Sequence, residues 1–222
     1  MRVVKDGWPL IIGIPVVGVL LGWLLRGFGW PAAGIAVALI GIVGGAFMVY
    51  FFRDPERFSP EDAACFVAGA DGWVRAVEEI YEDKHLKTEA VRISIFLSPF
   101  DVHVNRSPLT GKVTFLGYTP GKHLLTIQNA ASEHNEHSTI LVEGERTRCL
   151  IKQIVGPIVR RVVYWLQVGQ QLAKGERIGM MKFGSRLDML FPKSDVDVRV
   201  KKGDRVRAGE TVVAVLKRGQ GI

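Results

Sequence analysis

Cysteine is scarce in this sequence, and its scarcity excludes two classes of protein. The 222 residues include two cysteines, Cys65 and Cys149, and neither belongs to a C-x-x-C pair or to a zinc-ligand spacing. A disulfide-rich scaffold and a zinc finger are therefore excluded, and two buried free thiols in a reducing compartment are expected. His134 and His137 stand three residues apart, but no third ligand is fixed by spacing. We expect no metal site.

A run of basic residues interleaved with aromatic residues is also absent. The net charge is nevertheless +7, from 29 Lys and Arg against 22 Asp and Glu, and +5 of it falls after residue 57. A basic domain without such a run suits an anionic lipid surface better than nucleic acid. We therefore expect a membrane surface as the partner, and no nucleic acid.

Long apolar runs are confined to the first 52 residues. One covers residues 8–25 and the next covers 28–52, each close to the ~20 residues that cross a hydrocarbon core as a helix. The short link at Arg26 predicts a tight transmembrane hairpin, so residues 1–57 form a membrane anchor. Basic residues flank both ends of the hairpin, and only Arg26 lies at its tip. The positive-inside rule then places both ends, and the domain that follows, on the cytoplasmic side of the inner membrane.

Two other structures fit this segment. A cleaved signal peptide has a shorter apolar core, and no small-residue cleavage site precedes the second run. A re-entrant hairpin, which enters the bilayer without crossing it, stays open because of Pro15 and Pro31.

Helical periodicity is missing from residues 58–222, where short β-prone runs alternate with Gly, Pro, Asn and Asp. A β-dominated domain is predicted. The segments VGQQLAKGERIG and VKKGDRVRAGETVVAV share a valine, a glycine turn and a Gly-Glu pair before another apolar strand. This repeat is typical of barrel-sandwich folds of the biotinyl/lipoyl type, and it predicts architecture rather than chemistry. The predicted strands are Phe66–Val67, Trp73–Val77, Val91–Leu97, Gly111–Leu116, Leu124–Ile127, Thr139–Val142, Arg148–Val155, Val162–Leu166, Val196–Val200 and Thr211–Leu216.

Three short motifs contain reactive side chains. Asp71 stands in Ala-Asp-Gly, which by itself is good turn chemistry. The string SPFDVHVNRSP follows an apolar strand, and at β spacing Asp101, His103 and Asn105 share one face. Ser185 stands in Phe-Gly-Ser-Arg, and a Gly-Ser pair is common in any loop. Taken separately, each motif also fits a polar turn or a strand end.

Taken together, and in this order, the hairpin, FFRDPER, ADG, SPFDVHVNRSP, a basic loop and FGSR resemble the phosphatidylserine decarboxylase proenzymes of the short class. The resemblance runs from about residue 51 to residue 191. It implies that Ser185 attacks the carbonyl of Gly184 and becomes a pyruvoyl group, the cofactor of the family. The chain would then be cut into a β chain, 1–184, and an α chain, 185–222. The implied reaction is a decarboxylation in which phosphatidylserine forms a Schiff base, loses CO₂ and yields phosphatidylethanolamine.

The resemblance also assigns catalytic residues. The family activates its serine through an Asp–His–Ser arrangement, in which Asp71 matches the ADG aspartate and His103 is the expected base. Longer members carry H-x-x-H, whose second position is Arg106 here, and arginine stays protonated and cannot act as a base. His123 is the reserve candidate for the base. His103 is also the expected donor of the proton that replaces CO₂.

Charged residues around these motifs are candidates for binding the lipid phosphate or the serine carboxylate. They are Arg106, Lys112, Lys122, His123 and Arg186. Phe51, Phe52 and Phe58 are expected to form the lip of the lipid entry. The implied partners are phosphatidylserine in the membrane and the α and β chains of one proenzyme, and a homo-oligomer is left open.

Three other functions stay open. An archaetidylserine decarboxylase would use the same mechanism on a different lipid backbone. The sequence Met181-Lys182-Phe183 resembles the modified-lysine turn of biotinyl domains, so a membrane-anchored carrier would use Lys182. An inactive family relative would act as a scaffold, an alternative motivated by Arg106.

Overall fold

The chain divides into two compact units, and the boundary lies after Glu56. Each unit is described by itself. The computed structural model describes residues 2–121, 135–156, 162–182 and 185–217.

The first unit is a hairpin of two helices. α1 spans Trp8–Gly27 and α2 spans Pro31–Phe51, and both are long and apolar enough to cross a membrane. The helices pack through glycine, because a Cβ placed on Gly18 would lie 2.7 Å from the Cα of Gly41. Such small residues let two helices approach closely without an aqueous hydrophobic driving force.

The two ends of the hairpin meet in a short antiparallel pairing. β1 (Arg2–Val3) pairs with β2 (Arg53–Asp54), and the 3₁₀ helix η1 (Lys5–Gly7) leads from β1 into α1. Residues 28–30 form the turn at the other end, where Gly29 has a φ of 84°. Hence α1 runs two residues beyond its predicted end at residue 25, and α2 spans 31–51 instead of 28–52.

The prediction that Phe51, Phe52 and Phe58 form the lip of the lipid entry is wrong for the first two. Phe51 and Phe52 are fully buried, and the ring of Phe52 covers Gly7. Phe58 alone is exposed.

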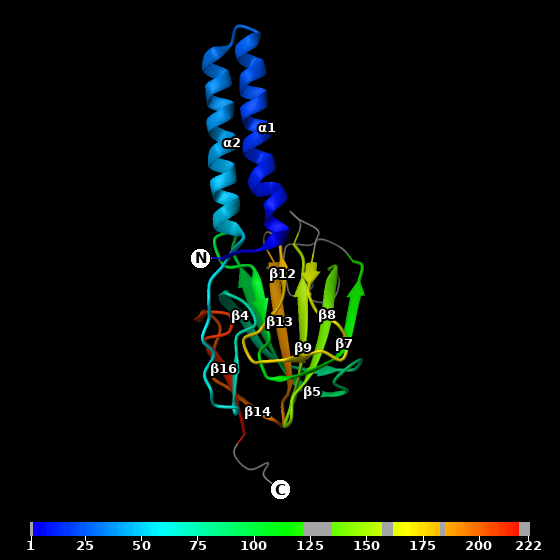
Figure 1. Ribbon diagram of the computed structural model, residues 1–222. Helices are drawn as coiled ribbons and strands as arrows, with labels where there is room; N and C mark the ends of the chain where they lie inside the picture. The colour runs from blue at the N-terminus through cyan, green and yellow to red at the C-terminus, as the bar shows by residue number, and fades with distance from the viewer. Residues whose placement is uncertain (1, 122–134, 157–161, 183–184, 218–222) are drawn as a thin grey trace. The chain divides into compact units, whose positions relative to one another are not determined.

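The second unit is built of strands, which confirms the β-dominated prediction. One antiparallel sheet has the order β11-β7-β8-β9-β13-β5-β4-β15, and two smaller sheets have the orders β10-β12-β6 and β14-β16-β3 (Figure 1). The strands are β3 (Cys65–Val67), β4 (Gly72–Glu82), β5 (Thr88–Leu97), β6 (Val104–Arg106), β7 (Gly111–Thr119), β8 (His137–Glu143), β9 (Arg148–Ile154), β10 (Val162–Tyr164), β11 (Gln171–Leu172), β12 (Arg177–Met181), β13 (Ser185–Pro192), β14 (Val196–Val198), β15 (Arg205–Val206) and β16 (Val212–Leu216).

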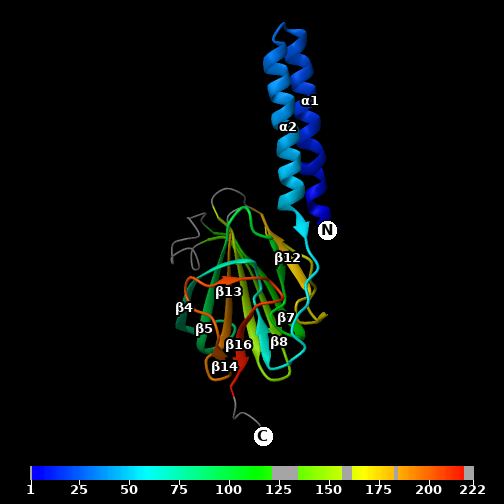
Figure 2. The ribbon, with the colours of Figure 1, turned by 90° about the vertical axis from the view of Figure 1, so that its left-hand side faces the viewer.

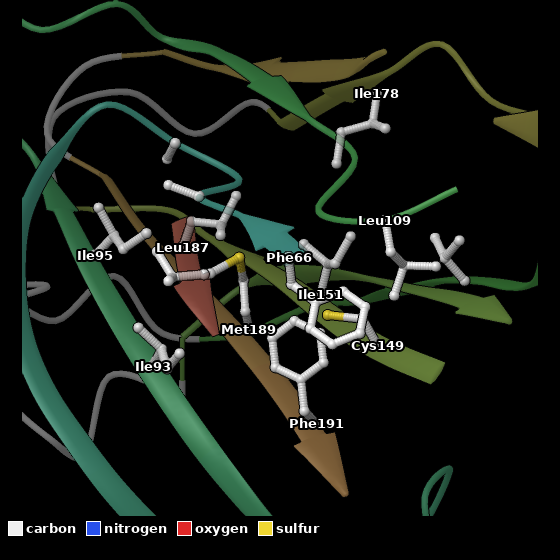
Figure 3. Close-up of a cluster of buried hydrophobic side chains, with 14 of the residues drawn as sticks. Phe66, Ile93, Ile95, Leu109, Cys149, Ile151, Ile178, Leu187, Met189 and Phe191 are labelled. Atoms are coloured by element: carbon white, nitrogen blue, oxygen red, sulfur yellow. The ribbon is translucent and has the colours of Figure 1, made fainter. Parts of the chain in front are cut away.

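The hydrophobic core lies between the curled large sheet and the two small ones. Strands β14 and β16 lie over one face of the large sheet (Figure 2). Inward side chains of β13 such as Met189 and Phe191 lie near Phe66 of β3 (Figure 3), and Ile178 of β12 belongs to the same cluster. The rings of Phe66 and Phe191 stack with centroids 5.2 Å apart. This packing holds β13 at the centre of the large sheet.

The repeat seen in the sequence is an internal structural repeat. β11 pairs with the start of β7, and β15 pairs with the start of β4, in matching register. The matching turns each need glycine at two positions, because a residue with positive φ is strained when it has a Cβ. These glycines are Gly169 and Gly175 in one copy, with φ of 93° and 80°, and Gly203 and Gly209 in the other, with φ of 95° and 76°.

The predicted strands are found, apart from Leu124–Ile127, which lies outside the described residues. Strands β6, β11, β12, β13 and β15 were not predicted. The most consequential omission is β13, because it begins at Ser185.

Candidate active site

Two strand pairs, one in the large sheet and one in a small sheet, position Ser185 and His103. β5 pairs with β13 in the large sheet, and the strands that continue them, β6 and β12, pair with each other in the small sheet. Ser185, the first residue of β13, is opposite Leu97, the last residue of β5. In the small sheet, the amide of Met181, the last residue of β12, donates to the carbonyl of His103 at 3.2 Å. Because β5 and β12 end at these two pairings, Ser185 and His103 are at the same end of the domain.

Ser185 has a fully buried side chain. Side chains alternate along a strand, so Ser185 is on the same face of β13 as the core residues Leu187, Met189 and Phe191. Its hydroxyl has no hydrogen-bond partner among the described residues. A buried polar atom without a partner is costly, and its retention points to a chemical use. Gly184, the other half of the expected cleavage site, lies outside the described residues.

His103 is almost fully buried, with 1% of its surface exposed. Its Nδ1 lies 2.9 Å from the backbone carbonyl oxygen of Asp101. A carbonyl can only accept, so Nδ1 carries the hydrogen and the neutral ring keeps its lone pair on Nε2. His103 is thus held in the tautomer that a general base needs.

Asp101 holds the loop before His103 in place. One carboxylate oxygen accepts hydrogen bonds from the amide and the hydroxyl of Ser98 at 2.8 and 2.7 Å. The other accepts from Arg205 at 2.8 Å. The loop is therefore fixed on both sides, and with it the carbonyl that orients His103.

Asp71 is buried at the start of β4. Its Oδ2 accepts a hydrogen bond from Arg57 at 2.8 Å, and its Oδ1 accepts one from the amide of Ala208 at 2.8 Å. The second bond belongs to the internal repeat, because in the other copy the amide of Lys174 donates to Thr110 in the same way. Asp71 lies in a bend before β4 and not in the hairpin turn that Ala-Asp-Gly suggests, and its contacts are with Arg57 and with an amide 137 residues away.

Burial raises the pKa of the Asp71 carboxyl. The negative charge of Asp101 raises this pKa as well, against the lowering effects of the Ala208 amide and the Arg57 guanidinium. Arg205, which donates to Asp101, is opposite Trp73 in β4, two residues after Asp71. Asp71 therefore lies close to the loop that carries His103.

A chain of buried polar side chains crosses the domain interior beside this site. The hydroxyl of Ser138 donates to Gln153 Oε1 at 2.7 Å, and Gln153 Nε2 donates to Asn105 Oδ1 at 2.7 Å. All three residues are fully buried. Strand spacing predicts Asn105 on the same face as His103 but indicates no role for it. The link to Gln153, 48 residues away, has no sequence signal.

Comparison with known proteins decides the family. The phosphatidylserine decarboxylase family model matches residues 45–214. The phosphatidylserine decarboxylase proenzyme of Symbiobacterium thermophilum is 39% identical over 215 residues, 96% of this chain and 95% of the relative. That of Carboxydothermus hydrogenoformans is 42% identical over 213 residues, 96% of each chain.

The chain belongs to the phosphatidylserine decarboxylase family. The resemblance read from the motifs is thereby confirmed, and the chain is a carboxy-lyase made as a proenzyme. A protein of this family fits the carrier alternative poorly.

The structure places Arg186 away from Ser185. As the next residue in β13, Arg186 points to the opposite face of the sheet, where its Nε donates to Asp188 at 2.7 Å and its Nη2 donates to Ser94 at 2.7 Å. All of these side chains are buried, so the described contacts of Arg186 are structural.

Arg106 and Lys112 are also not gathered at Ser185. Arg106 is buried, and its Nη1 donates to the carbonyl of Gly175 at 2.9 Å in the internal repeat. Lys112 is opposite Glu143, which is opposite Arg148 of β9, whereas Arg186 is opposite Ile154 of the same strand. Lys112 and Arg186 are therefore six residues apart along the strand direction, which is roughly 20 Å. A cavity lined by Lys112 and Glu143 lies at this far end. The remaining binding candidates, Lys122 and His123, lie outside the described residues.

The site has the residues that a pyruvoyl cofactor requires. That group is made from a serine of the chain itself, and Ser185 has a buried hydroxyl with no partner in the described part of the chain. No group of three His, Cys, Asp or Glu that could hold a metal ion occurs among the described residues.

Proposed function

We propose that the chain is the precursor of a membrane-anchored phosphatidylserine decarboxylase that cuts itself between Gly184 and Ser185. The observation that supports this most directly is the buried hydroxyl of Ser185, which has no partner in the described ranges of the chain and lies at the same end of the domain as His103. A serine hydroxyl is a weak nucleophile at its ordinary pKa and needs an adjacent base. His103 supplies that base through Nε2.

Self-cleavage begins with an N→O acyl shift. The Oγ of Ser185 attacks the carbonyl carbon of Gly184 while His103 takes the hydroxyl proton. The carbon–nitrogen bond then breaks, and His103 returns the proton to the nitrogen of residue 185. Loss of the Cα proton of residue 185 then expels the Gly184 carboxylate from the ester, which leaves residues 1–184 and a dehydroalanine at the start of the C-terminal chain. The dehydroalanine tautomerises to an imine, and water hydrolyses the imine to the pyruvoyl group with release of ammonia.

Asp71 assists His103 through its charge. Its described hydrogen bonds go to Arg57 and Ala208, and Arg205 joins the start of β4 to Asp101 in the loop before His103. A negative charge at that place favours the imidazolium that forms when His103 takes the proton, as the aspartate of a catalytic triad does.

The pyruvoyl group supplies a ketone that condenses with the substrate amine and takes up electrons as CO₂ leaves. The chain's own contribution to that reaction is a proton donor, and His103 is the buried imidazole at the same end of the domain as residue 185.

The helical hairpin suits a substrate that stays in the bilayer. We propose that it anchors the enzyme in the inner membrane with its domain on the cytoplasmic side, because Arg2, Lys5, Arg53 and Arg57 flank the hairpin and Arg26 lies at its tip. An anchored enzyme meets phosphatidylserine by two-dimensional diffusion.

Intact mass spectrometry of purified wild type and Ser185→Ala tests the proposal. We expect wild type to give two chains, with residues 185–222 blocked by a pyruvoyl, and Ser185→Ala to stay whole. Release of CO₂ from vesicles of phosphatidylserine, and of archaetidylserine in parallel, then identifies the substrate. A wild-type chain that stays at 24.5 kDa in native membranes contradicts the mechanism.

A further inference from the structure

Asn105 contributes a further buried polar atom to this end of the domain. The side-chain nitrogen of Asn105, Nδ2, is buried and has no hydrogen-bond partner among the described residues. The mechanism above uses Ser185 and His103 but gives this nitrogen no function. A buried donor left without an acceptor in a folded protein calls for an explanation.

The neighbours of Asn105 determine which way its amide faces. Asn105 Oδ1 accepts from Gln153, whose own oxygen accepts from the hydroxyl of Ser138. This direction of donation fixes the NH₂ group of Asn105 on the side away from Gln153. Because the three side chains are fully buried and linked, the amide has little freedom to rotate.

The register of the sheet makes Gln153, the partner of Asn105, a diagonal neighbour of Ser185. Gln153 is opposite Leu187, which stands two residues from Ser185 on the same face of β13. Diagonal neighbours on one face of a sheet are about 7–8 Å apart. A Cβ on Gly69 would meet both a methyl group of Leu187 at 3.1 Å and the carbonyl of Arg106 at 3.3 Å, so the backbone next to Asn105 passes close to Leu187.

His103, which directly precedes β6, has its side chain on the same side of that strand as Asn105. The two residues are two apart in an extended segment whose pairing with β12 runs from Arg106 to His103. The interior at this end therefore combines a nucleophile, a base and a directed hydrogen-bond donor. Those are the three components of acyl transfer at a carbonyl.

From this geometry we infer that Asn105 is a catalytic residue of self-cleavage, whose Nδ2 donates to the carbonyl oxygen of Gly184 as Ser185 attacks. The inference rests on the proposed function. When the Oγ–carbon bond forms, the electron pair of the carbonyl double bond moves onto this oxygen. Asn105 stabilises that oxyanion, and the pair returns to the carbonyl when the carbon–nitrogen bond breaks.

Asn105→Asp is the sharpest test, because it keeps the oxygen that accepts from Gln153 and replaces the donor by an acceptor. The protein is made by cell-free synthesis as the full chain with lipid nanodiscs, and uncut and cut chains are followed with time at mildly alkaline pH. We expect self-cleavage to slow by about 10²–10³-fold, the effect of removing one oxyanion-hole donor. A variant that cuts at the wild-type rate overturns the inference while leaving the proposed function intact. A wild type that stays whole overturns both.

Ser107→Ala is the matched control for a loss of structure. Its hydroxyl is also fully buried and donates to the carbonyl of Leu109 at 2.7 Å, two residues beyond Asn105. We expect a lower thermal midpoint and an unchanged cleavage rate. If Ser107→Ala slows cleavage as much as Asn105→Asp does, the effect is structural and the inference is wrong.

Hydroxylamine identifies the step that is affected. It cuts the ester that the acyl shift produces, and so it accelerates chain cleavage only where that ester has formed. Because Asn105 acts in forming the ester, we expect hydroxylamine to leave Asn105→Asp uncut. Rescue of the variant by hydroxylamine would place its defect in a later step and overturn the inference.

Discussion

The Nδ1 atom of His103 lies 2.9 Å from the backbone carbonyl oxygen of Asp101, so a main-chain atom sets the tautomer of the proposed base. Substitution of the Asp101 side chain leaves that oxygen in place. The two residues can therefore be separated by mutation.

We expect His103→Asn to slow self-cleavage by about 10²–10⁴-fold, the usual contribution of a general base. Asp101→Asn should stay within about tenfold of wild type, because an amide oxygen still accepts from Ser98 and the orienting carbonyl is retained. The measurement is the fraction of cut chain against time. Equal losses in the two variants would show that the loop, and not the imidazole, limits the reaction.

Asp71 is predicted to act through its charge. Arg57 bridges Asp71 and Glu210, with both distances at 2.8 Å, so the chain offers a matched pair of carboxylates. We expect Asp71→Asn to slow self-cleavage by at least about tenfold, because it removes the charge that favours the His103 imidazolium. Glu210→Gln should leave the rate unchanged, although it also removes a partner of Arg57. If both variants cut equally slowly, Arg57 acts by holding the structure and the charge of Asp71 is irrelevant.

The buried pair of Arg186 and Asp188 is predicted to matter for stability. Removing one partner of a buried ion pair leaves an uncompensated charge and costs about 3–5 kcal/mol. We expect Arg186→Met and Asp188→Asn each to lower the thermal midpoint strongly in a Ser185→Ala background, which keeps the chain uncut. The double variant should recover part of this loss, because no single charge remains buried. Additive losses in the double variant would contradict a direct coupling of the two residues.

The sequence predicted the parts of the fold that follow local rules. Apolar length gave the two helices, and glycines at matching positions revealed the internal repeat, whose two copies pair in the same register. Strand β13 was missed because Arg186 and Asp188 interrupt its apolar pattern. Both are buried in an ion pair, a situation that periodicity does not detect.

The candidate site was predicted in its residue types and only partly in its contacts. The motif that contains His103 gave the base, but the group that orients it is a carbonyl, which no side-chain motif can reveal. Arg186 was expected beside the substrate because it follows Ser185, yet strand alternation turns it to the opposite face. The link between Asn105 and Gln153 joins β6 to β9, and such contacts depend on tertiary packing alone.

His137 is predicted to make the precursor sensitive to acid. It is nearly buried at the start of β8, and its Nδ1–H donates to the carbonyl of Asn135 at 2.7 Å. Burial lowers the pKa of His137, and the charges of Lys152 and Lys84 lower it further, against the raising effects of the Asn135 hydrogen bond and Asp188.

The direction of the effect follows from proton linkage. The unfolded chain takes up a proton at this histidine near pH 6.5, whereas the folded chain does so only at lower pH. The contribution of His137 to stability is therefore present above the unfolded pKa and is lost as pH falls toward the lowered folded pKa. In the Ser185→Ala background, we expect the thermal midpoint to fall less in the His137→Gln variant than in the parent as the pH drops from about 8 to about 5. Parallel pH curves for the two proteins would mean that another group controls the acid response.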